Sequence, residues 1–124
     1  MNPEIENLVK EWKEKSENDL GSAQLLLKET NYYEISAYHS HQSIEKILKA
    51  EILKEGKSFK FTHDLNSLFL QVLDEESNLF DKVSYVNSLY PLLRYQSGDK
   101  ILKSQAEEAL QIAREIFLFF KKEI

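Results

Sequence analysis

Polar and ionisable side chains gather in one stretch, Ala37 to Ala50, whose apolar spacing is typical of a largely buried helix. At about 100° per residue, one stripe of this helix carries a polar set: His39, Gln42, Lys46 and Lys49, with Glu45 at its edge. The other side carries apolar residues: Ile44, Ile47 and Leu48. Buried polar atoms need hydrogen-bond partners, so the stripe is either an internal network or a binding site.

Two neighbouring histidines, His39 and His41, raise the question of a metal site. Their side chains lie about 200° apart around a helix, so one ion cannot bind both from this helix. The metal-binding patterns His-Glu-x-x-His and Glu-x-x-His do not occur. We therefore expect no metal and no cofactor, with one histidine partly buried in a structural hydrogen bond and the other on the surface.

The charged members of the stripe allow two interpretations. In the first, Glu45 pairs with Lys49 one turn later on a solvated face, which contributes a few tenths of a kcal/mol. In the second, Lys46 and Gln42 face another helix and bind an anion or the edge of a base, while Glu45 holds a lysine in place. Spacing alone favours the first interpretation, because charged residues on helices usually serve solvation.

Further groups suited to anion binding lie outside this helix. Arg94 and Tyr95 precede a Gln-Ser-Gly-Asp segment. Arginine offers a planar fork for phosphate and tyrosine can stack on a base, although a structural salt bridge explains the arginine equally well. The loop after the stripe adds three cationic residues: Lys57, Lys60 and His63. The sequence contains no glycine-rich phosphate loop and no nucleophile elbow.

The composition predicts a single domain, residues 1–124, in the cytoplasm. A chain of 124 residues with 42% hydrophobic content can bury a core, and the absence of cysteine excludes disulfides and cysteine-ligated zinc. No apolar run reaches the length of a membrane span, and the N-terminus lacks a signal-peptide pattern, so we expect no membrane contact. The formal net charge of −5 argues against a general nucleic-acid coat, but residues 39–63, with five lysines and three glutamates, leave room for a local anion site.

Long 3.6-residue periodicities, with three glycines and two prolines, predict helices and no strands. The first helix is expected from Pro3, capped by Asn2, to about Lys28. A second helix is expected to be capped by Asn31, with Glu34 in a capping box, and to end at Gly56, and a third is capped by Thr62 or Asp64. A fourth helix is expected from about Leu79, with a bend or an end near Leu89-Tyr90 before Pro91. The last helix has capping-box spacing over Ser104-Gln105-Ala106-Glu107 and ends at Lys121-Lys122.

These elements predict an all-α fold, an up-and-down antiparallel four-helix bundle with an additional short helix. The first helix is expected to face inward with the following residues: Ile5, Leu8, Trp12, Leu20, Ala23 and Leu27. The short third helix is expected to face inward with these: Leu65, Leu68, Phe69 and Val72.

Several motifs occur together along this chain. They are the run Ala37-Tyr38-His39-x-x-Gln42-x-x-Glu45-Lys46-x-x-Lys49-Ala50, then Gly56, then Thr62-His63-Asp64-Leu65, and finally Arg94-Tyr95. Together they resemble the HEPN domain, a family named for nucleotide binding in higher eukaryotes and prokaryotes. The resemblance extends from about Trp12 to Phe120.

The resemblance implies a helical homodimer, often encoded beside a minimal nucleotidyltransferase as a two-component system. In several such pairs the HEPN member is an RNA-cleaving toxin and the transferase its antitoxin; in others it is a nucleotide- or substrate-binding subunit. By matching position, the resemblance implies a candidate cluster for nucleotide or phosphate contact: His39, Gln42, Glu45, Lys46, Lys49, His63, Arg94 and Tyr95. Arg94 and Lys46 would neutralise phosphate, and Tyr95 would stack on a base.

The ribonucleases of this family use an arginine followed four to six residues later by a histidine, and neither Arg94 nor Arg114 has one here. RNA cleavage needs a general acid or base that works near neutral pH. We therefore expect a non-catalytic subunit that binds a nucleotide or a nucleic-acid end and acts with a nucleotidyltransferase. Two alternatives stay open: a divergent ribonuclease that uses His39 or His63, and an interaction module that binds a partner without a ligand.

Overall fold

The chain folds into five helices and no strands over the residues that the computed structural model describes, 1–94 and 100–122, with the side chains of 91–94 outside the description. The helices are α1 (Pro3–Glu29), α2 (Tyr33–Lys54), α3 (Leu65–Phe69), α4 (Phe80–Arg94) and α5 (Lys103–Lys121). The predicted all-α bundle with one short extra helix is confirmed.

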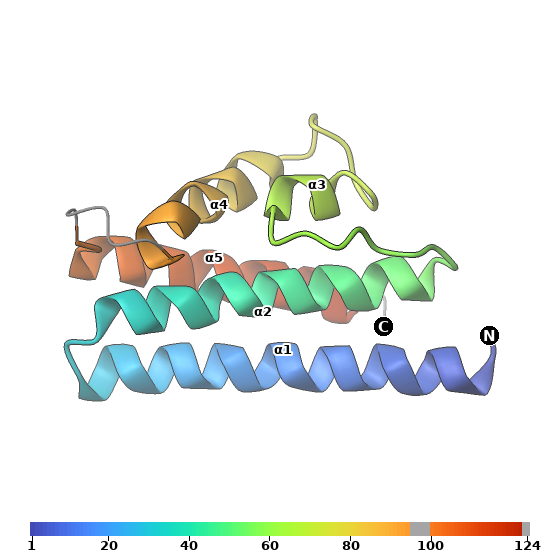
Figure 1. The fold of residues 1–124 in the computed structure, drawn as a ribbon, viewed down its shortest axis with the longest axis horizontal. Coiled ribbons are helices and arrows are strands. Elements are labelled where there is room, and N and C mark those ends of the chain that lie inside the picture. Colours follow the sequence, from blue (N-terminus) through green and yellow to red (C-terminus); the bar gives the residue numbers. More distant parts are fainter. Residues whose placement is uncertain (95–99, 123–124) are drawn as a thin grey trace.

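Helix α2 lies at the centre of the molecule and contacts each of the other helices. Figure 1 shows α1 and α2 running antiparallel side by side, with α5 along α2 and with α3 and α4 on the side of α2 away from α1. The four long helices alternate in direction along the chain. Residues on different faces of α2 therefore meet different partners: α1 on one side, and α3 and α4 on another.

Most of the predicted helix ends agree with the structure. The Asn2 side chain accepts a 2.7 Å hydrogen bond from the backbone N–H of Glu4, and the Asp64 side chain accepts one from Asn66, so both act as N-caps. After α2, Gly56 adopts φ +79°, the left-handed conformation that ends a helix. These local signals work because each satisfies a backbone group that the helix leaves unpaired.

Three predicted boundaries are wrong. Helix α2 has Tyr32 as its N-cap and no side-chain cap, in place of Asn31. The early end predicted near Leu89-Tyr90 is wrong, because helix α4 continues through Pro91 to Arg94; the alternative of a bend at that point stays a prediction. At α5 the cap falls earlier than predicted, at residue 102, whose N–H binds the side chain of Gln105 at 2.8 Å. Shifts of one or two residues are ordinary at helix ends, and Pro91 lies within α4 although its type favours a helix end before it.

The apolar core lies between α2, α3, α4 and α5 and not around α1. Its largest fully buried apolar side chains are Phe69, Ile44, Ile47, Leu48, Ile52, Leu65, Leu68, Ile116, Val83 and Val86. Helix α1 buries only four residues: Val9, Ser16, Asp19 and Ala23. The predicted inward residue Leu8 is instead 41% exposed, because the face of α1 that meets α2 passes through small and polar residues.

Small side chains let α1 and α2 approach each other closely. The Ser16 hydroxyl donates to the backbone carbonyl of Ser43 at 2.7 Å, and the Ser36 hydroxyl donates to the carbonyl of Ala23 at 2.8 Å. Both serines are fully buried. The contact between these helices is therefore partly polar, and each of these buried hydroxyls would cost about 1–3 kcal/mol if it were left unpaired.

Two glycines, Gly21 and Gly56, differ in backbone conformation although a Cβ added at either meets no atom within 4 Å. Gly21 lies inside α1 and is not needed for close packing, so Gly21→Ala is expected to stabilise the protein by about 0.5–1 kcal/mol. Gly56→Ala is expected to destabilise it, because Gly56 has a positive φ that strains an alanine. Urea unfolding of both variants measures the change in the free energy of unfolding. Equal changes of the same sign would contradict the different backbone conformations of Gly21 and Gly56.

Candidate functional site

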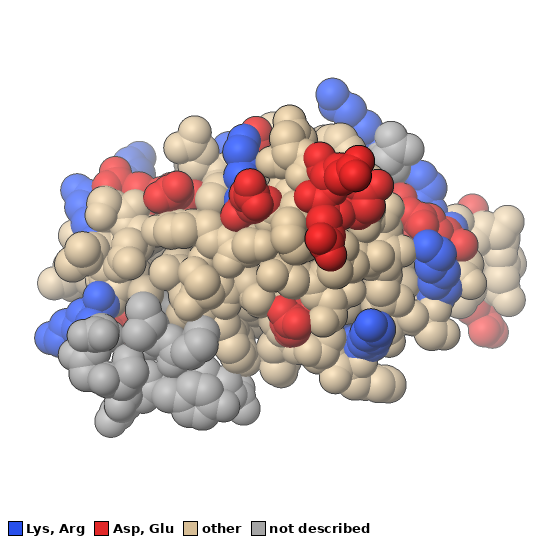
Figure 2. Space-filling view, turned by 90° about the horizontal axis from the view of Figure 1, so that it is seen from above, with Lys and Arg blue, Asp and Glu red and all other residues tan. Residues whose placement is uncertain are grey.

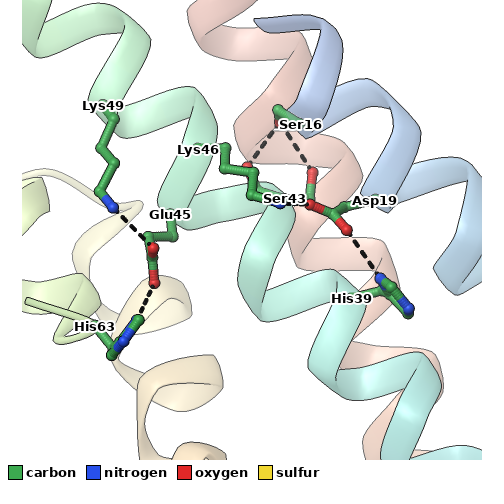
Figure 3. Close-up of polar contacts among 8 residues, drawn as sticks. All are labelled: Ser16, Asp19, His39, Ser43, Glu45, Lys46, Lys49 and His63. Carbon is green, nitrogen blue, oxygen red and sulfur yellow. Dashed lines mark hydrogen bonds and ion pairs between the residues drawn. The ribbon is translucent and has the colours of Figure 1, made fainter. Parts of the chain in front are cut away.

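Two carboxylates, one on α1 and one on α2, each bind one lysine and one histidine. Asp19 on α1 binds His39 and Lys46, and Glu45 on α2 binds Lys49 and His63. Figure 3 shows the two groups on different sides of α2, the Asp19 group toward α1 and the Glu45 group toward the loop that carries His63. The polar stripe of α2 is therefore divided between two networks.

The Asp19 group closes the contact between α1 and α2. One Asp19 oxygen lies 2.8 Å from Nδ1 of His39, and the other lies 2.6 Å from Nζ of Lys46. The side chains of His39 and Lys46 are only 29% and 23% exposed. Lys46 faces another helix, as the second interpretation predicted, but its partner there is a carboxylate of the same chain.

The Glu45 group is more deeply buried. The Glu45 side chain is 4% exposed, and its two oxygens lie 2.9 Å from Nζ of Lys49 and 3.0 Å from Nδ1 of His63. Nζ of Lys49 also lies about 5 Å from the ring centres of Trp12 and Phe59, a distance at which a cation and an aromatic ring attract. The predicted Glu45 to Lys49 pair is thus confirmed, but the solvated face expected for it is wrong.

The carboxylates determine the proton positions on the two histidines. An ionised carboxylate only accepts hydrogen bonds, so Nδ1 of His39 and Nδ1 of His63 must be the donors. In the neutral ring, Nε2 is then the nitrogen with a free lone pair. The side chain of His63 is 55% exposed, which makes it the more accessible of the two.

The third histidine, His41, lies in the core beneath Tyr90. It is fully buried, and neither ring nitrogen makes a hydrogen bond of normal geometry to the described residues. Burial lowers the pKa of His41 from 6.5 to about 4, despite the opposing effect of the Glu45 charge. The expectation that one of the neighbouring histidines lies on the surface is therefore wrong: His39 is the partly buried, hydrogen-bonded one and His41 is a neutral core residue.

Three rings form a stack between α2, the loop and α4. The ring centre of Tyr90 lies 4.5 Å from that of His41 and 5.6 Å from that of His63, and its plane is within 20° of the His63 plane. On its outer side this stack borders an open hollow of about 310 Å³. The hollow is lined by Thr62, His63, Asp64, Asn87 and Tyr90. Its size is at the lower end of the range for small-molecule pockets.

Asp64 anchors the wall of this hollow. Hydrogen bonds from Ser67 and Asn87, with help from backbone N–H groups, lower the pKa of Asp64 below its usual value. One Asp64 oxygen accepts from Asn87 at 2.8 Å, and the side-chain oxygen of Asn87 accepts from the backbone N–H of Leu65 at 2.9 Å. These bonds fix α4 against the start of α3 and place His63 beside Tyr90.

The structure brings only part of the predicted cluster together. Glu45, Lys49 and His63 lie in one group next to the hollow, while His39 and Lys46 lie in the Asp19 group. Gln42 is buried, and its side-chain nitrogen has no hydrogen-bond partner among the described residues. Arg94 is the last residue of α4, and its side chain is outside the description. Tyr95 lies outside the described residues.

Two residues of these networks, Asp19 and Tyr90, were missed by the sequence analysis, and His41 was considered there only as a metal ligand or a structural histidine. The polar spacing of α1 could have revealed Asp19, since Ser16 and Asp19 fall on the face that also carries Val9, Trp12 and Ala23. Two polar residues on a helix face that is otherwise apolar indicate a polar partner opposite. No local signal points to the stacking of Tyr90 on two histidines, because these residues come from separate elements.

Among the described residues, the face formed by α3 and α4 presents no continuous basic surface in the view of Figure 2. Acidic side chains gather there over the connection between α3 and α4, which contains Asp74, Glu75 and Glu76. Within the described ranges, no three metal-binding side chains lie close enough to hold an ion, and no helix combines the length and apolarity needed to span a bilayer.

The comparisons with known proteins agree with the fold and the motifs. The family model described as "HEPN domain" matches residues 9–124, so the chain belongs to the HEPN family. In structure, it is similar to TT1696 from Thermus thermophilus, with a TM-score of 0.78, 24% identity and coverage of 94% of this chain and 98% of that one. It is also similar to ST0689, an archaeal HEPN homologue, with a TM-score of 0.75, 23% identity and coverage of 93% and 96%.

Among curated proteins, the chain is similar to MJ1304 of Methanocaldococcus jannaschii, which is named as a candidate toxin. The two are 29% identical over 126 aligned positions, which cover 86% of this chain and 82% of MJ1304.

The burial of His41 predicts a pH effect on stability. In the unfolded chain the His41 ring is protonated below about pH 6.5, whereas in the folded protein it is protonated only below about pH 4. The free energy of unfolding therefore decreases as the pH falls from 6.5 toward 4. Between pH 7.5 and pH 5 the loss from this residue is about 2 kcal/mol. In His41→Phe, which keeps a ring beside Tyr90, urea unfolding at the two pH values should show a correspondingly smaller loss; an unchanged loss would mean that His41 is not the group responsible.

Proposed function

We propose that this chain binds a nucleotide, or the end of a nucleic-acid strand, in the hollow beside Tyr90. The observation that carries the proposal is the stack of His63 on Tyr90, which places the outer ring face of His63 and one directed ring nitrogen at the edge of an open hollow that Tyr90 also lines. Such rings suit the planar face of a base. Both are held from behind, Tyr90 by His41 and His63 by Glu45, so little ordering is needed on binding.

The phosphate contact is assigned mainly to Arg94. Lys46 and Lys49 are each paired with a carboxylate, so the charges of these two lysines are already compensated inside the protein. Arg94 follows Tyr90 by about one helical turn on α4, which places it on the same side of that helix as the stacked ring. An arginine there could bind a phosphate of a base stacked near Tyr90, with bidentate geometry.

The proposal includes a homodimer and a minimal nucleotidyltransferase partner, acting with this chain as a toxin–antitoxin-like pair. What supports this part is the membership in the HEPN family and the similarity to a candidate toxin. Sedimentation of the purified chain and co-purification with a nucleotidyltransferase encoded next to it would examine both. Binding of the partner without any ligand would favour the simpler interaction module.

Isothermal titration with nucleoside triphosphates tests the hollow. We expect His63→Ala to weaken binding by about tenfold, because it removes both a stacking face and a hydrogen-bonding nitrogen. His39→Ala is the matched control, since His39 also binds a carboxylate through Nδ1 but lies in the Asp19 group. Equal effects of the two substitutions, or none from either, would contradict the placement of the ligand in this hollow.

A second candidate function, RNA cleavage, is favoured by the Glu45 to His63 hydrogen bond. A carboxylate that holds Nδ1 leaves Nε2 to take a proton from a ribose hydroxyl, as a general base does. With structured RNA, this function requires cleavage by the wild type, a loss of about a hundredfold or more in His63→Ala, and little change in His39→Ala. No cleavage by the wild type would leave binding as the only function of the site.

A further inference from the structure

A second surface lies beside the hollow, on the loop of residues 57–63. The sequence of this loop, Lys-Ser-Phe-Lys-Phe-Thr-His, places lysines and phenylalanines close together and contains no acidic residue. Phe61 is completely exposed, at 101%, more than any other large apolar side chain in the described residues. Exposing a phenyl ring gives up the stability that burying it would provide, so its position calls for an explanation.

The loop is held in one conformation by the turn that follows α3. The Gln71 side chain accepts from the backbone N–H of Lys60 at 3.1 Å and donates to the carbonyl of Ser58 at 3.0 Å. Nζ of Lys57 donates to the Gln71 carbonyl at 2.8 Å. The exposure of Phe61 is therefore fixed by hydrogen bonds to its neighbours in the loop.

Aromatic rings continue from Phe61 back to α1. The ring centre of Phe61 lies 6.2 Å from that of Phe59, which lies 5.7 Å from that of Trp12, both in edge-to-face arrangements. Lysines accompany these rings: Nζ of Lys15 lies 5.1 Å from the Trp12 ring centre, and Lys60 is an exposed lysine that lies between Phe59 and Phe61 in the sequence. We call Trp12, Phe59, Phe61, Lys15 and Lys60 the aromatic–lysine surface, in which Phe61 is the fully exposed ring and Trp12 and Phe59 are half-buried.

We propose that the aromatic–lysine surface binds a single-stranded nucleic acid whose terminal nucleotide occupies the hollow. Aromatic rings with nearby ammonium groups match the alternation of bases and phosphates along a strand. Thr62 and His63 line the hollow and directly follow Phe61, so one strand can lie on both. This inference rests on the proposed function and extends it from a single nucleotide to a strand of several.

Fluorescence anisotropy with labelled single strands of about eight nucleotides tests the inference, with a nucleoside monophosphate as the short ligand. We expect Phe61→Ala to weaken strand binding by about fivefold or more and to leave monophosphate binding unchanged. Phe61→Trp should retain the affinity, whereas Phe61→Leu should be as weak as Phe61→Ala, because leucine keeps apolar area but cannot stack. Lys60→Ala should make the salt dependence shallower by about 0.7 in logarithmic slope.

Leu118→Ala is the control, since Leu118 is a half-exposed apolar residue on α5 (51%). RNA and DNA strands of the same sequence are both expected to bind, because a ring face does not read the ribose hydroxyl. Monophosphate binding that depends on His63, together with strand binding that ignores Phe61, overturns this inference alone. Full strand affinity in Phe61→Leu also overturns it and points to a protein partner, and failure of both ligands to bind overturns the proposed function as well.

Discussion

The buried carboxylate of Glu45 imposes the constraint on which the rest of the site depends. A carboxylate with 4% exposure needs charged partners, since an isolated buried charge costs several kcal/mol. Lys49 supplies one partner from the next turn of α2, and His63 supplies the other from the loop beyond it. The second bond requires the chain to return to the middle of α2 after Gly56, which brings the start of α3 and the stacked ring of Tyr90 to the same place.

The same principle attaches α1 to α2. Asp19 needs partners at 12% exposure, and it finds Lys46 and His39 on the opposite helix. Because both carboxylates bind a lysine, the polar stripe of α2 presents little uncompensated positive charge to a ligand. In the function proposed above, recognition therefore falls to groups outside these lysine pairs: His63 and Tyr90, which line the hollow, and the arginine at the end of α4. In that proposal, aromatic rings take the ligand-binding role that the sequence analysis gave to the lysines.

The sequence was sufficient to predict the helices, the bundle and the family, because apolar periodicity and capping residues act locally. Asn2, Asp64 and Gly56 each fix a helix end through a bond or dihedral angle that neighbouring residues determine. The sequence also identified the polar stripe on a largely buried helix, although it favoured a solvated face for the Glu45 to Lys49 pair. The division of this stripe between two networks was not predicted. Whether Lys46 binds a phosphate or Asp19 depends on a residue of another helix, 27 positions earlier in the chain.

The stack of His41, Tyr90 and His63 was beyond sequence reasoning for the same reason. Its members come from α2, the loop and α4, and the spacing between them carries no period. Pro91 indicates an early end of α4 and makes Tyr90 a boundary residue, whereas Tyr90 lies inside the helix. The full burial of His41 likewise follows only from the packing of three elements.

The tautomer of His63 is the most direct test of the central role of Glu45. In a ¹⁵N-edited NMR spectrum of the histidine rings at alkaline pH, we expect His63 to carry its proton on Nδ1. Glu45→Gln should weaken this preference, because an amide can donate to Nδ1 as well as accept from it, and Glu45→Ala should remove it. A proton on Nε2 in the wild type would show that Glu45 does not hold the ring, and the arrangement of the site described above would then be incorrect.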